Sequence, residues 1–137
     1  MKKFRLLSLT LLITIGIILP SGCTSNETSI TIIEDITPEN AFTLIQDNPD
    51  IIIIDVRTPR EFEEEHIENA ININFYSSAF IENLKTLDKN KTYLVYCAIG
   101  VRSSNAVKIM ADIDFTKTYN LLGGIKQWKS QGLPTAN

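Results

Sequence analysis

The chain has 137 residues, of which 44% are hydrophobic and 21% charged. This composition allows one domain of ordinary size with a buried core and excludes a chain that is disordered throughout. The net charge is −3, and it becomes −6 (10 basic, 16 acidic residues) once the three basic residues of segment 1–22 are set aside. An acidic domain repels phosphate backbones, which argues against nucleic acid as a partner.

The first 22 residues have the layout of a secretory signal peptide. Lys2, Lys3 and Arg5 precede the apolar segment 6–19, and small residues follow it. As a helix, this segment of 14 residues would reach roughly 21 Å, which is less than the roughly 30 Å of a hydrocarbon core. We therefore predict that residues 1–22 are a cleaved signal peptide and do not form a spanning helix.

The end of this segment also resembles the lipobox of prokaryotic lipoproteins. Ser21 and Gly22 precede Cys23, the residue that is lipidated in such proteins and becomes the new N-terminus. Pro20 stands where the motif usually has leucine, so plain secretion and an uncleaved membrane anchor remain alternatives. All three alternatives export the domain, because the basic residues stay inside. With lipid on Cys23, the protein would be anchored to the extracytoplasmic face of the cell membrane, and residues 23–29 would form a short polar tether.

Residues 30–135 are predicted to form a single α/β domain with a mainly parallel central sheet and helices on both faces, because strand-length apolar runs alternate with helix-like segments. The run 51–54 lacks polar alternation, as expected for a strand buried on both faces. Strands are predicted at 29–33, 51–54, 70–73, 92–96 and 118–122. Helices are predicted at 38–46, 59–64, 78–87, 103–112 and 124–130.

Cys97 follows the predicted strand 92–96, at the carboxyl edge of the sheet, where open α/β folds place their sites. If Cys23 carries lipid, Cys97 has no disulfide partner within the chain, because these are its two cysteines. A tight loop then leads into a helix, and its backbone N–H groups are expected to form a nest that holds an anion. We expect this nest to lower the pKa of Cys97 and make its thiolate a nucleophile. A buried cysteine retained for packing is the alternative.

The loop after Cys97 supplies the residues that we expect to bind substrate. In this loop Gly100 permits a backbone angle that other residues resist, and Arg102 offers a fixed charge and paired donors for an oxyanion. The predicted substrate-binding residues are Ala98, Ile99, Gly100, Val101, Arg102 and Ser103.

Several other polar residues have a structural interpretation. Asp55 and Arg57 follow a buried strand, and we expect an ion pair that braces the loops, with substrate contact as the second choice. His66 is the only histidine, and a hydrogen-bonded structural role is preferred to a Cys–His pair. The acidic run 61–65 is interpreted as a solvated helix face. No metal is expected there, because no histidine or cysteine cluster accompanies it.

Four ordered motifs resemble the rhodanese family of sulfurtransferases. The active-site loop of that family is similar to segment 96–103, and its early signature is similar to Asp55-Val56-Arg57, Glu61-Phe62, His66-Ile67 and segment 70–73. Its C-terminal signature is similar to Gly123-Gly124, Trp128, Gly132 and Pro134. The resemblance implies that Cys97 takes sulfane sulfur as a persulfide from a small donor such as thiosulfate. It then passes the sulfur to a thiol or cyanide-like acceptor, and no cofactor is implied.

Two other functions use the same loop. Cysteine-dependent phosphatases also present a Cys-loop-Arg cradle, but their loops hold five residues between the two side chains, whereas this chain has four. A narrower ring of donors suits a sulfur atom better than a tetrahedral phosphate. The third hypothesis is a binding module without turnover, in which a partner detects oxidation or sulfur loading of Cys97.

Overall fold

The computed structural model describes residues 31–137, so the predicted signal peptide 1–22, Cys23 and the tether 23–29 lie outside the described residues. The strands are β1 (Ile32–Ile36), β2 (Ile52–Asp55), β3 (His66–Ile67), β4 (Ile71–Asn72), β5 (Thr92–Tyr96), β6 (Lys117–Leu121) and β7 (Thr135–Ala136). The helices are α1 (Pro38–Asp47), α2 (Pro59–Glu64), α3 (Phe80–Lys85), α4 (Val101–Asp112) and α5 (Gly124–Ser130). Between residues 31 and 137, no helix has the length and apolar character needed to cross a membrane.

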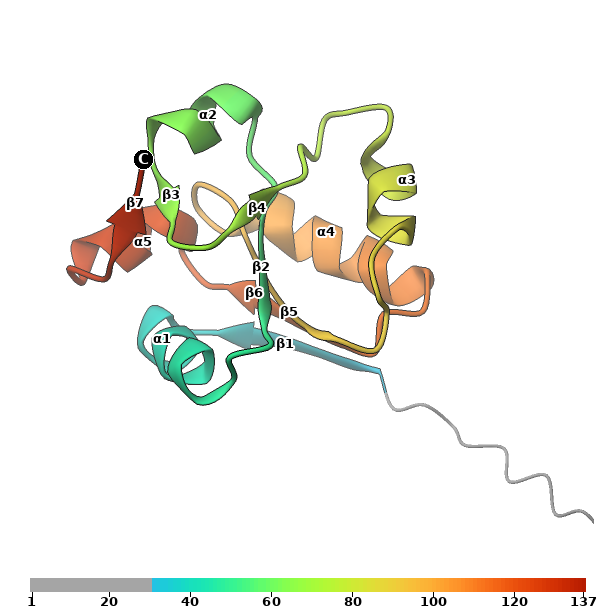
Figure 1. Ribbon diagram of the computed structural model, residues 1–137, viewed down its shortest axis with the longest axis horizontal. Helices are drawn as coiled ribbons and strands as arrows, with labels where there is room; N and C mark the ends of the chain where they lie inside the picture. Colours follow the sequence, from blue (N-terminus) through green and yellow to red (C-terminus); the bar gives the residue numbers. More distant parts are fainter. Residues whose placement is uncertain (1–30) are drawn as a thin grey trace, which may run out of the picture.

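The central sheet has five strands in the order β1-β6-β5-β2-β4, and every neighbouring pair is parallel (Figure 1). Strands β5 and β2 lie inside this sheet, which explains the apolar runs 52–54 and 93–96 within them. A second sheet pairs β3 with β7 in antiparallel register. The predicted fold class, a single α/β domain with a parallel central sheet and helices on both faces, is confirmed.

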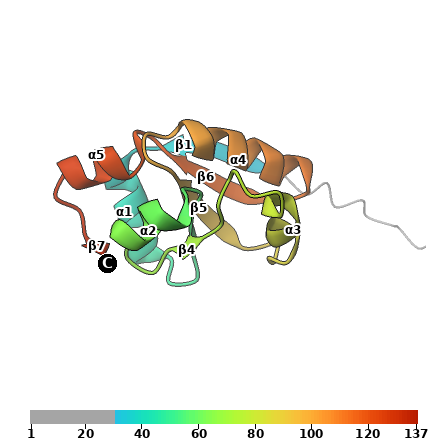
Figure 2. The ribbon, with the colours of Figure 1, turned by 90° about the horizontal axis from the view of Figure 1, so that it is seen from above.

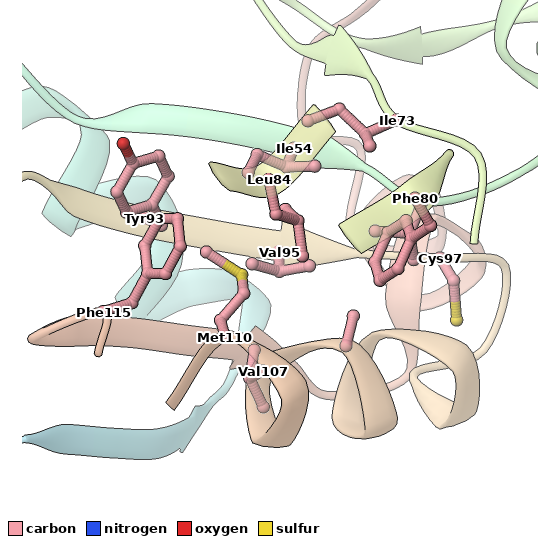
Figure 3. Close-up of a cluster of buried hydrophobic side chains, with 12 residues drawn as sticks. Ile54, Ile73, Phe80, Leu84, Tyr93, Val95, Cys97, Val107, Met110 and Phe115 are labelled. Carbon is pink, nitrogen blue, oxygen red and sulfur yellow. The ribbon is translucent and has the colours of Figure 1, made fainter. Parts of the chain in front are cut away.

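Each face of the central sheet packs against its own pair of helices (Figures 1 and 2). One core contains residues of α3 and α4, and the other contains residues of α1 and α5. Side chains of β5 alternate between them, with Tyr93 and Val95 in the first core and Leu94 and Tyr96 in the second. Cys97 continues the first set, and Figure 3 shows it at the end of that core.

The element boundaries differ from the predicted ones at several places. The predicted strand 29–33 begins outside the described residues, and its predicted end is three residues too early. Strand β1 is an edge strand that continues to Ile36, and its exposed Glu34 and Asp35 do not follow the apolar pattern. Helix α4 begins at Val101 and not at residue 103, since Gly100 takes a left-handed conformation immediately before it. The prediction did not include β3 and β7, because two residues are too short to show a periodicity.

Candidate active site

Cys97 lies just beyond the carboxyl end of β5, and its side chain is almost completely buried, with 1% of the residue exposed. Its sulfur lies at the edge of a cavity of about 520 Å³. The cavity is lined by Thr58, Glu61, Tyr76, Cys97, Ala98, Ile99, Val101 and Arg102. A single thiol at the floor of a small pocket can attack only a donor that enters this pocket.

Hydrogen-bond donors surround the sulfur atom. The backbone N–H of Gly100 donates to Cys97 Sγ at 3.1 Å, and the backbone N–H groups of Ile99 and Ser103 also face it. Burial alone would raise the pKa of Cys97, but these donors together with the Ser103 hydroxyl outweigh burial, and the pKa of the thiol is lowered from its ordinary value. The same donors would stabilise a persulfide anion at this position.

The N-terminus of α5 fixes the direction of the loop peptides. The N–H of Ile125 donates to the carbonyl oxygen of Cys97 at 2.9 Å, and the N–H of Lys126 donates to that of Ala98 at 3.1 Å. Because a trans peptide directs its C=O and N–H groups to opposite sides, the N–H of Ile99 is turned toward the sulfur. Gly124 makes this approach possible, since a Cβ there would lie 2.4 Å from the Cys97 oxygen.

Behind the sulfur, a chain of polar side chains links helix α4 to strands β6 and β1. The Ser103 hydroxyl lies 3.6 Å from Cys97 Sγ and 2.6 Å from Asn120 Oδ1. The amide of Asn120 in turn donates to Asp35 Oδ1 at 2.7 Å. Ser103 is fully buried and does not line the cavity, so the structure places it against the nucleophile and not against a substrate.

Arg102 is held by Glu61 at the wall of the cavity. Its two terminal nitrogens donate to the two carboxylate oxygens of Glu61 at 2.9 and 2.8 Å. Glu61 also accepts from the backbone N–H of Thr58 and so completes a capping box at the start of α2. The hydrogen bonds to Arg102 outweigh the effect of burial and lower the pKa of Glu61 to about 2. The guanidinium therefore faces the pocket with its charge already paired.

Asp55 and Arg57 form a second ion pair, at the end of β2. Arg57 donates to both oxygens of Asp55, with the shortest contact at 2.7 Å, and to the carbonyl of Glu65 at 2.6 Å. Asn72 joins the same network by donating to the backbone oxygens of Asp55 and Arg57. This arrangement agrees with the bracing role that was the first choice from the sequence, and neither residue lines the Cys97 cavity.

The other residues singled out from the sequence fall into two groups: those that line the cavity or contact the sulfur, and those that lie elsewhere. Ala98, Ile99 and Val101 line the cavity, and Gly100 contributes the N–H described above. His66 stacks on Phe62, shares a hydrogen bond with its carbonyl and does not line the cavity. Residues 31–137 hold no group of three or more potential metal ligands.

Glu61, Thr58 and Tyr76 belong to the pocket but were not identified as site residues from the sequence. The interpretation of the acidic run as wholly solvated is wrong for Glu61, which pairs with Arg102, and for Glu65, which pairs with Lys129. A local signal existed for Glu61, because Thr58-Pro59-Arg60-Glu61 is a capping-box sequence.

Residues 37–131 match the family model described as Rhodanese-like domain. The chain belongs to the rhodanese family. It is 37% identical over 81 residues to the thiosulfate sulfurtransferase GlpE of Coxiella burnetii, a match that covers 59% of this chain and 74% of the relative. A tRNA uridine(34) hydroxylase of Yersinia pestis is 36% identical over 98 residues, covering 64% of this chain but only 27% of the hydroxylase.

Solved structures of rhodanese proteins share the fold. A rhodanese-related protein from Thermoplasma volcanium is 31% identical with a TM-score of 0.66, covering 75% of this chain and 97% of that protein chain. A rhodanese-like domain protein from Staphylococcus aureus is 30% identical with a TM-score of 0.62, covering 74% and 96%. Because the matched region makes up almost all of both solved chains, a rhodanese-like domain of this size folds without a further domain in the same chain.

Proposed function

We propose that this protein is a sulfurtransferase that carries sulfane sulfur as a persulfide on Cys97. The observation that carries the proposal is the ring of N–H donors around a buried sulfur at the floor of the cavity. Such a site stabilises a sulfur anion without a neighbouring general base. The similarity to a relative whose name specifies thiosulfate sulfurtransferase supports the same reaction class.

The cycle has two steps. The Cys97 thiolate attacks the outer sulfur of thiosulfate, the S–S bond of the donor breaks, and sulfite leaves with the bonding electron pair. Cys97 then carries the outer sulfur as a persulfide. A thiolate or cyanide attacks that sulfur, and the Cys97 thiolate leaves, so that one sulfur atom has moved and the enzyme is regenerated.

The test is transfer of sulfur from thiosulfate to cyanide by residues 24–137, with aryl phosphates offered in parallel. We expect repeated turnover to thiocyanate and no phosphate release, since four residues between Cys97 and Arg102 form too narrow a cradle for phosphate. Faster hydrolysis of aryl phosphate than sulfur transfer would contradict the proposal. A single loading event without turnover would favour the sensing module.

We also propose that the domain is exported and anchored to the membrane by lipid on Cys23, with residues 1–22 as the signal peptide. The basic, apolar and small-residue order before Cys23 supports this placement. In the full chain, Cys23→Ser should release the domain from the membrane fraction or leave an unprocessed precursor. A Cys23→Ser protein that is still cut after Gly22 and still membrane-bound would overturn the lipid anchor and leave the sulfur chemistry unaffected.

A further inference from the structure

Among residues 31–137, no unpaired positively charged side chain lines the Cys97 cavity. Besides Cys97, its charged lining residues are Glu61 and Arg102, and these two neutralise each other through two short hydrogen bonds. When Cys97 is a thiolate, the lining therefore has a net charge of about −1. The pKa of Glu61 is lowered to about 2, so its carboxylate is ionised at neutral pH.

The neighbouring groove does not supply a cation to the cavity. Its basic residues Arg57 and Lys129 are paired with Asp55 and Glu65. Lys126 is exposed on α5, and it lines that groove and not the Cys97 cavity. A dianion that approaches the thiolate through the cavity therefore meets a like charge, and no unpaired guanidinium or ammonium of the described residues lines the cavity to offset it.

Beside the ion pair, the walls of the cavity are mostly apolar. Ile99, Val101 and Tyr76 line it and are 59%, 61% and 69% exposed. Large apolar side chains that remain this open around a reactive atom provide contact surface for an apolar group of a ligand. Arg102 lies over the Tyr76 ring at 5.6 Å, so this ring also helps to hold the guanidinium against Glu61.

We infer that the cavity selects sulfur donors with one negative charge or none and an apolar substituent over the thiosulfate dianion, and that Glu61 sets this preference by neutralising Arg102. This inference rests on the proposed sulfurtransferase function. Organic persulfides and thiosulfonates have the required chemistry. Glu61 is thus a specificity-determining residue that acts through Arg102.

The chemical step balances for a thiosulfonate donor. The Cys97 thiolate attacks the outer sulfur of benzenethiosulfonate, and the bond between that sulfur and the sulfonyl sulfur breaks. Benzenesulfinate leaves with the electron pair, and Cys97 is formally oxidised to the persulfide while the donor is reduced to the sulfinate. Cyanide then takes the outer sulfur as thiocyanate and returns Cys97 to the thiolate, and each step conserves charge.

The experiment compares three donors at one pH, with cyanide as acceptor: thiosulfate, methanethiosulfonate and benzenethiosulfonate. Methanethiosulfonate and benzenethiosulfonate each carry one negative charge, and only benzenethiosulfonate has an apolar ring. For each variant the readout is the ratio of kcat/KM values between two donors, divided by the same ratio in the wild type. This comparison removes the differences in the intrinsic reactivity of the donors. Glu61→Gln retains a capping-box residue at the start of α2 and frees Arg102 from its ionic partner.

Glu61→Gln should raise the thiosulfate-to-methanethiosulfonate ratio about tenfold, because a cation now faces the dianion. Glu64→Gln is the matched control, since it removes the same charge from the same helix but from a residue paired with Arg60. Its ratio should stay near that of the wild type. Equal ratios in wild type and both variants, or an equal rise in both variants, would overturn the inference.

Ile99→Ser tests the apolar wall without disturbing the core, because this side chain is exposed. It should lower the benzenethiosulfonate-to-methanethiosulfonate ratio of kcat/KM several-fold. An unchanged ratio would show that the cavity does not favour donors with an apolar substituent. Absence of thiocyanate from all three donors would refute the proposed function itself. Transfer with a thiosulfate preference that Glu61→Gln leaves unaltered would refute only the donor selectivity.

Discussion

The Asp55–Arg57 and Glu61–Arg102 ion pairs lie on neighbouring segments but differ in burial and in what they connect. The Asp55 and Arg57 side chains are 0% and 8% exposed and are two residues apart in the chain. The Glu61 and Arg102 side chains are 33% and 17% exposed and join α2 to the start of α4, 41 residues apart. The first pair is enclosed by protein and fixes a turn, whereas the second faces the cavity.

This difference separates a structural charge pair from a functional one. Breaking a buried pair destabilises the fold strongly, because removing one partner leaves the other charge buried with neither a partner nor water to solvate it. A partly exposed pair contributes little to folding, so its partners can be changed with the fold retained. We therefore expect substitutions of Asp55 or Arg57 to lower the stability of the fold. Substitutions of Glu61 or Arg102 should instead change which sulfur donors the protein uses best.

The largest expected effect is on stability. Asp55→Ala should lower the free energy of unfolding by about 3–5 kcal/mol, because it leaves the Arg57 guanidinium buried without its carboxylate. Urea denaturation of residues 24–137 measures this loss. Glu64→Ala, which breaks the exposed Arg60–Glu64 pair, is the control and should change the free energy by less than about 0.5 kcal/mol. Similar losses in both variants would remove the distinction between buried and exposed pairs.

Arg102→Ala should act on catalysis more than on folding. It leaves the Glu61 carboxylate unpaired at the cavity wall, which adds a negative charge where the donor enters. We expect kcat/KM for thiosulfate to fall by an amount equivalent to about 1.5–3 kcal/mol, the range for losing a charged hydrogen bond. Arg102→Lys should rescue poorly, because an ammonium lacks the planar fork. Unchanged kinetics together with a large loss of stability would assign Arg102 to structure.

Ser103→Ala tests whether uncharged donors set the reactivity of the nucleophile. The variant removes a hydroxyl that faces Cys97 and so should raise the pKa of the thiol. The rate of alkylation by iodoacetamide, measured against pH, should then reach its midpoint at a higher pH than in the wild type. The adjacent Ser104→Ala is the control and should leave the midpoint in place. If both variants have the wild-type midpoint, the Ser103 hydroxyl is not a significant donor to the thiolate.

The smallest effect concerns acid stability. The pKa of Glu61 is lowered from 4.5 to about 2, so its ion pair stabilises the fold fully above the unfolded value and loses this contribution as the pH falls toward about 2. The stability difference between wild type and Glu61→Gln should therefore shrink between about pH 5 and about pH 2. Chemical denaturation at several pH values measures it, and a difference that is constant with pH would contradict the lowered pKa.

The sequence predicted most of the fold because its signals were local. The strands predicted at 51–54 and 92–96 and the helices predicted at 38–46 and 124–130 each follow from neighbouring residues, and β2, β5, α1 and α5 lie there. Trp128, which belongs to the C-terminal signature, lies in the core and is 1% exposed. The two-residue strands gave no comparable signal.

The candidate site was only partly accessible from the sequence. Cys97 and its loop were identified because strand, loop and helix are contiguous in the chain. The pairing of Arg102 with Glu61 and the chain from Ser103 through Asn120 to Asp35 depend on which strands and helices become neighbours. Separations of 41 and 85 residues have no local pattern to reveal them, so these contacts required the fold.

The most direct test of the central claim is mass spectrometry of residues 24–137 after treatment with thiosulfate and, separately, with benzenethiosulfonate. We expect one added sulfur atom, located on the peptide that contains Cys97, and we expect cyanide to remove it. Cys97→Ser should gain no sulfur. Sulfur loading that survives in Cys97→Ser, or a wild-type protein that accepts no sulfur from either donor, would contradict a persulfide on Cys97.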